Sequence, residues 1–112
     1  MNTALAQNAD DARIPIPPGA IESFCRKWQV DEFALFGSVL RADFNDGSDV
    51  DVLITFAPDA RPTLMTLADM EAELEALFRR RVDLVERRGM EQCENPYIRD
   101  PVIQSARVIY AR

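Results

Sequence analysis

Two segments decide the fold: residues 32–38 (EFALFGS) and, after ten intervening residues, residues 49–56 (DVDVLITF). The first segment is short, apolar and aromatic and runs into a glycine, which predicts a buried strand followed by a turn or a new helix. The second segment alternates apolar side chains with other residues, as a strand with one buried face does. Asp49 and Asp51 therefore lie on the same face of the second predicted strand.

The flanking sequence predicts helices and a third strand. Apolar residues recur at helical spacing over residues 19–29 and 66–80, and Thr66-Leu67-Ala68-Asp69 resembles a capping box at the start of the second helix. Residues 82–86 predict a strand on which Asp83 faces away from Val82 and Leu84. A turn at residues 94–96, a short helix interrupted by Pro101 and a β-rich end at residues 108–110 follow.

These elements predict an α+β (mixed α/β) fold: a short twisted mixed sheet with helices 19–29 and 66–80 packed on one face. The other face then carries Asp49, Asp51 and Asp83. Residues 1–18 are polar and then proline-rich, so we expect a flexible N-terminal segment before a single domain at residues 19–112. This segment lacks the basic start and apolar run of a secretory signal, and we expect a cytoplasmic protein.

Composition excludes several classes of function. The 112 residues carry a formal net charge of −6, which argues against direct nucleic-acid binding, and no apolar stretch is long enough to span a membrane. The absence of histidine removes the commonest general base and most zinc sites. The basic run Arg79-Arg80-Arg81 fits either a helix end or a binding patch. Chemistry must then rest on carboxylates, amines or a bound metal.

The carboxylates and the glycine together form a candidate site for phosphoryl or nucleotidyl transfer. Gly37 permits close backbone approach and Ser38 offers a hydroxyl, so this pair can bind the terminal phosphates of a nucleotide. Asp49 and Asp51 can share Mg²⁺, which prefers oxygen ligands, and Asp83 can complete a two-metal site and orient or deprotonate an acceptor hydroxyl. A single aspartate of this kind can equally be a solvated charge or a turn cap.

The combination resembles a known family. Gly37-Ser38, ten residues and Asp49-Val50-Asp51 are similar to the G-S-x10-D-x-D signature of the polymerase-beta-like nucleotidyltransferase superfamily, and the short length resembles its minimal nucleotidyltransferase group. The resemblance implies that Gly37 and Ser38 bind triphosphate, that Asp49, Asp51 and Asp83 bind Mg²⁺ and that Asp83 also serves the acceptor. Arg41 is similar to a basic residue that touches phosphate, although a solvent-exposed arginine remains the alternative. Ala42 departs from the glycine that often follows.

Relatives of this size are antitoxins of HEPN/MNT toxin–antitoxin systems. The resemblance thus implies an enzyme that uses ATP and a pair of Mg²⁺ ions to attach AMP to a tyrosine of a cognate HEPN-type RNase toxin, in a hetero-oligomer with that toxin. Two alternatives remain open: an antitoxin that acts by steric binding with little catalysis, and a nucleotidyltransferase of the aminoglycoside type that modifies a small molecule.

Overall fold

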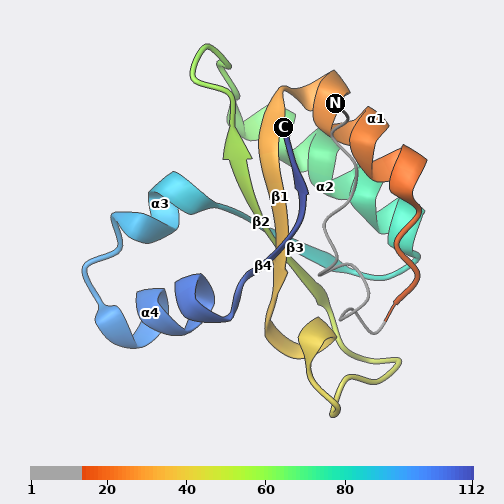
Figure 1. Cartoon of the computed structure of the whole chain (residues 1–112), viewed down its shortest axis with the longest axis vertical. Helices are drawn as coiled ribbons and strands as arrows, with labels where there is room; N and C mark the ends of the chain where they lie inside the picture. Colours follow the sequence, from red (N-terminus) through yellow and green to blue (C-terminus); the bar gives the residue numbers. More distant parts are fainter. Residues whose placement is uncertain (1–13) are drawn as a thin grey trace.

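The computed structural model describes residues 14–112, and its four strands form one mixed sheet in the order β3-β2-β1-β4 (Figure 1). The elements are α1 (Pro18–Trp28), β1 (Val30–Phe36), the 3₁₀ helix η2 (Gly37–Leu40), β2 (Val50–Phe56), α2 (Leu64–Phe78), β3 (Val82–Glu86), α3 (Arg87–Glu91), α4 (Pro96–Ser105) and β4 (Arg107–Ala111). Strand β1 is antiparallel to both β2 and β4, whereas β2 and β3 are parallel. The predicted α+β class with a mixed sheet is confirmed.

The expected N-terminal segment lies largely outside the described residues, because these begin at residue 14. Helix α1 begins at Pro18, one residue before the predicted start, and ends where Gln29 adopts a left-handed conformation with φ of 59°. The backbone N–H of Gln29 donates to the Cys25 carbonyl, which satisfies one of the unpaired carbonyls at the helix end. The chain then passes directly into β1.

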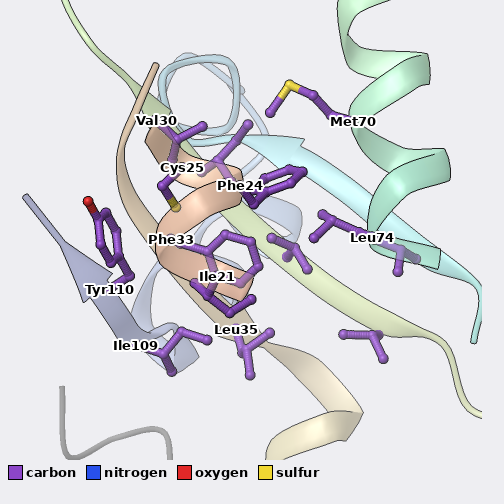
Figure 2. Packing of buried hydrophobic residues seen from close by; sticks show 14 of the residues in the cluster. Ile21, Phe24, Cys25, Val30, Phe33, Leu35, Met70, Leu74, Ile109 and Tyr110 are labelled. Carbon is purple, nitrogen blue, oxygen red and sulfur yellow. The ribbon is translucent and has the colours of Figure 1, made fainter. Parts of the chain in front are cut away.

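The main core lies between the sheet and helices α1 and α2 (Figure 2). The alternation predicted for β2 is confirmed, since Val50, Val52, Ile54 and Phe56 are all buried in this cluster. Helix α1 contributes Ile21, Phe24 and Cys25, α2 contributes Met70 and Leu74, and β4 contributes Ile109 and Tyr110. Burial of this apolar surface fixes which face of β2 points inward, and with it the face that carries the aspartates.

The opposite face of the sheet has its own apolar cluster, around Ala34, Phe36 and Leu53. Val102 and Ile103 of α4 and Met90 of α3 pack against it, so α3 and α4 lie across the sheet from α1 and α2 (Figure 1). Helices 19–29 and 66–80 thus pack on one face as predicted, whereas the packing of α3 and α4 on the other face was not part of the prediction. Helix α3 has only five residues and α4 contains Pro101, so neither shows a long helical period in the sequence.

The start of α2 also differs from the prediction. Its N-cap is Thr63, and the capping box joins Thr63 to Thr66 rather than Thr66 to Asp69. The Thr66 N–H donates to Thr63 Oγ1 over 3.2 Å, and the Thr63 N–H donates to Thr66 Oγ1 over 3.1 Å. A threonine hydroxyl thus takes the place of the Glu or Gln side-chain oxygen usual at this position.

Among residues 14–112, no helix is both long and apolar enough to cross a membrane.

Candidate active site

Gly37 sits at the end of β1, where the backbone packs directly against the Asp51 side chain. Its φ of 74° lies in the left-handed region, and a Cβ built there would overlap the Asp51 carboxylate, with the Asp51 Cγ only 3.3 Å away. The register explains the contact, because Phe36 pairs with Asp51 across β1 and β2. Glycine is therefore required at this position both for its backbone conformation and for its lack of a side chain.

After Gly37 the chain makes one short 3₁₀ turn, not a regular α-helix. Val39 is buried and anchors this turn, while Ser38 is half-buried. Ser38 Oγ lies 3.5 Å from the Asp49 backbone oxygen, a long hydrogen bond that leaves the hydroxyl free to engage a ligand. Arg41 lies just beyond η2 with an extended backbone (φ −111°, ψ 155°).

The candidate carboxylates meet where β2 and β3 begin. Asp51 and Asp83 are register partners on these parallel strands, so their side chains share the face away from the main core. Burial raises the pKa of the half-buried Asp51, and the negative charges of Asp83 and then Asp49 raise this pKa further. The sheet thus brings both Asp83 and Asp49 within electrostatic reach of Asp51.

Asp49 has a cationic partner of its own. Its Oδ1 lies 3.3 Å from Arg81 Nε in a solvent-exposed ion pair. Within residues 14–112 no three carboxylate or thiol side chains are already gathered as a metal-binding group. The donor set nevertheless suits Mg²⁺, because it consists of hard carboxylate oxygens whose mutual repulsion a divalent cation would relieve. Only the Asp49 side chain has to leave a protein partner to join such a site.

The positive charge of Arg41 acts on Asp51, where it lowers the pKa of the carboxyl against the larger effects that raise it. Its Nε donates to Asp43 Oδ1 over 3.1 Å, and this hydrogen bond lowers the pKa of the Asp43 carboxyl. Both side chains are well exposed. Arg41 is thus a cation near the acidic group, free on its outer side to meet an anionic ligand.

Two residues of the site entered the sequence analysis only as members of the basic run at residues 79–81, for which a helix end and a binding patch were both open. Arg81 pairs with Asp49, and its carbonyl accepts a hydrogen bond from the Val50 N–H at 2.9 Å. Arg80 binds the loop that precedes Asp49. The basic run at residues 79–81 and the nearby turn residues 45–48 were the available signals, but pairing the two requires knowledge that β3 lies beside β2.

The fold and the site define a nucleotidyltransferase domain. Residues 18–109 match the family of this description, and the chain belongs to it. Among characterised relatives, the protein adenylyltransferase MntA of Thermococcus cleftensis is 41% identical over 59 residues, which are 53% of this chain and 58% of that protein. A Methanocaldococcus jannaschii protein provisionally assigned as a protein adenylyltransferase is 28% identical over 76 residues, covering 68% of this chain and 73% of the relative.

Solved structures agree with this assignment. A structure provisionally assigned as a minimal nucleotidyltransferase shares 32% sequence identity, with a TM-score of 0.61 over 80% of this chain and 85% of that one. A toxin–antitoxin structure with AMP-PNP superposes with a TM-score of 0.65 over 84% of this chain and 73% of that one. At 17% identity, the second likeness concerns the fold alone.

Proposed function

We propose that this chain is a Mg²⁺-dependent nucleotidyltransferase that transfers AMP from ATP to a tyrosine of a cognate HEPN-type RNase toxin and thereby acts as its antitoxin. The observation that carries the proposal is the contact of Gly37 with Asp51, whose register partner is Asp83. It joins a candidate phosphate-binding turn to a carboxylate cluster. Membership of the nucleotidyltransferase domain family supports the reaction class.

Each residue has a distinct role in the proposed reaction. Gly37 and Ser38 hold the β- and γ-phosphates through backbone N–H groups and the serine hydroxyl, and Arg41 offers a guanidinium to the same phosphates. The tyrosine oxygen attacks the α-phosphorus, a new P–O bond forms, the bond to the bridging oxygen breaks, and diphosphate leaves. Asp83, the most exposed of the three aspartates, takes the tyrosine proton.

Asp49, Asp51 and Asp83 would hold a pair of Mg²⁺ ions. When bound, these ions neutralise charge on the triphosphate and polarise the attacked phosphorus. To join these ions, Asp49 would have to leave its ion pair with Arg81. The free-energy cost would be small, because an exposed ion pair contributes about 0–1 kcal/mol. The freed Arg81 then faces the same anionic substrate.

A protein acceptor is supported by the relatives and by the surface. The Thermococcus relative is a protein adenylyltransferase, and the solved structures of similar fold include a toxin–antitoxin structure. Tyr97 and Ile98 on α4 and Leu64 and Met65 on α2 are exposed apolar side chains. These exposed groups also favour the second candidate function, an antitoxin that neutralises its toxin by binding without transfer.

The decisive experiment combines the purified chain, ATP labelled at the α-phosphate, Mg²⁺ and the HEPN protein encoded beside it. We expect label on a toxin tyrosine, located by mass spectrometry, and its loss in Asp51→Asn. Asp59→Asn is the matched control, because Asp59 is exposed and follows the opposite end of β2. An unlabelled toxin that Asp51→Asn still neutralises in cells would replace transfer by steric binding as the function.

A further inference from the structure

The loop at residues 41–49 connects the two halves of the proposed site. It starts after η2, which follows Gly37 and Ser38, and it ends at Asp49. Most of its residues are exposed, and only Phe44, Ser48 and Asp49 are partly buried. Its own hydrogen bonds are local: the Gly47 N–H donates to Asn45 Oδ1 over 2.8 Å and the Ser48 N–H donates to the Asn45 carbonyl over 3.0 Å. Phe44 packs against the main core, but the exposed residues that follow it need a further anchor to hold one conformation.

Arg80 supplies this anchor with a single side chain. Its Nη1 donates to the Asn45 carbonyl over 2.9 Å and to the Ser48 carbonyl over 3.2 Å. Its Nη2 lies 3.8 Å from Asp46 Oδ1, and its guanidinium carbon lies 4.4 Å from the centre of the Phe44 ring. The side chain is only 20% exposed, so these hydrogen bonds and the cation–π contact are partly shielded from water.

The backbone holds Arg80 rigidly opposite the loop. Helix α2 ends at Phe78, and Arg79 turns the chain through a left-handed conformation with φ of 58° before β3 starts at Val82. The Val50 N–H bonds to the Arg81 carbonyl over 2.9 Å, which fixes this junction to the start of β2. Arg80 therefore projects from the junction between α2 and β3, and its hydrogen bonds tie the loop to this junction.

We propose that Arg80 is a positioning residue. By holding residues 44–48 of the 41–49 loop, it keeps Asp49 and Asp51 opposite Gly37 and Ser38. The inference rests on the proposed transferase function. We assign Arg80 to the loop because its Nη1 donates to two loop carbonyls and its Nη2 lies near a loop carboxylate. The hydrogen-bond and ion-pair partners of Arg80 all lie in this loop, and Phe44, whose ring it contacts, packs against the edge of the main core. Arg80 itself is not part of that core, so its removal should loosen the loop while the buried core residues keep their packing.

Arg80→Met tests this role, because methionine retains an unbranched stem against Phe44 but has no donors. Arg80→Lys keeps the charge and can reach one carbonyl. Arg88→Met is the matched control, since Arg88 is exposed and its side chain makes no hydrogen bond or ion pair within residues 14–112. The readouts are amide hydrogen exchange at Gly47 and Ser48, and steady-state AMP transfer to the same toxin.

In Arg80→Met we expect the Gly47 and Ser48 amides to exchange roughly tenfold faster or more, with the amides of β1 and β2 unchanged. We expect kcat at saturating ATP to fall by roughly tenfold to a hundredfold, as for a site displaced by about 1 Å. Arg80→Lys should recover part of both losses, and Arg88→Met should match the unchanged chain. A purely stabilising residue would not couple loop exchange to kcat in this way.

Unchanged loop exchange in Arg80→Met, or transfer at the rate of the unaltered chain, overturns the role of Arg80 while the proposed function stands. If the unaltered chain transfers nothing, the proposed function fails, and with it the catalytic consequence of Arg80. In that case faster exchange at Gly47 and Ser48 still supports Arg80 as the anchor of the loop, whereas unchanged exchange removes that role too.

Discussion

Replacing Gly37 with alanine should damage stability and activity together, for two reasons that can be separated. At φ of 74° an L-residue pays about 1–2 kcal/mol for the left-handed conformation alone. The new methyl also overlaps the Asp51 carboxylate, so that side chain must move. Such overpacking costs about 1–3 kcal/mol. The sum, about 2–5 kcal/mol, is a large share of the 5–15 kcal/mol that is typical of a domain's total stability.

A double-mutant cycle with Asp51→Ala isolates the second term. Without the carboxylate, the nearest remaining atom to the new methyl is the Asp51 Cβ at 3.6 Å, which is an ordinary contact. Gly37→Ala should then cost only the backbone term, about 1–2 kcal/mol. The measurement is urea unfolding followed by the fluorescence of Trp28, which is partly buried against the core. Gly89→Ala is the control, because no atom lies within 4 Å of its added methyl.

The cycle has an outcome that refutes the reasoning. If Gly37→Ala costs the same free energy of unfolding with and without the Asp51 carboxylate, then the two residues are not in the contact described. Retained AMP transfer by Gly37→Ala would add to the refutation, since a displaced Asp51 cannot keep its place in the site. A loss confined to activity, with stability unchanged, would show that the backbone at residue 37 relaxes at no cost.

Three further predictions concern charge and the core. The pKa of Asp51 is raised in the folded state, so its ionised form destabilises the fold, and this lost stability returns as the pH falls through that pKa. Asp51→Asn should therefore have a higher melting temperature than the unaltered chain at pH 7. The difference in melting temperature should vanish in acid. Burial raises the pKa of the Cys25 thiol to about 12, so iodoacetamide at pH 8 should label Cys93 alone, and labelling of Cys25 in the native protein would contradict its burial. Leu74→Ala should cost about 2–5 kcal/mol in urea unfolding, and a cost below about 1 kcal/mol would deny it a place in the core.

The strands and the carboxylate positions could be predicted because a period of two fixes them locally. The alternation of residues 49–56 decides which way Asp51 points, and the core around Val50 and Val52 confirms it. The parallel pairing of β2 with β3 joins residues more than thirty apart, and only this pairing makes Asp83 the neighbour of Asp51. Asp51 and Asp83 thus share one face of the sheet, while the roles of the candidate site residues in binding and transfer stay predictions.

Other features depend on contacts that no local pattern encodes. Helices α3 and α4 are positioned by their packing against Ala34, Phe36 and Leu53. Their own sequences contain a glycine and Pro101, which disfavour helix. The sequence left a turn or a new helix open after the first strand, and the structure has a short 3₁₀ turn, at whose end the Arg41 N–H donates to the Ser38 carbonyl at 2.9 Å. The run at residues 79–81 had two readings at the sequence level, and in the structure two of its arginines face the acidic loop.

The raised pKa of Asp51 supports the proposed cation site on this face of the sheet. The half-buried carboxylate of Asp51 is repelled by Asp83 and Asp49, which lowers the stability of the fold. Asparagine would fill the same space without this repulsion. Natural proteins keep such unfavourable arrangements chiefly where function needs them. Gly37 adds to the case, since its left-handed backbone is pressed against the same carboxylate rather than against the apolar core. A bound divalent cation would relieve the repulsion that raises the pKa of Asp51, so MgATP should raise the melting temperature of the unaltered chain more than that of Asp51→Asn.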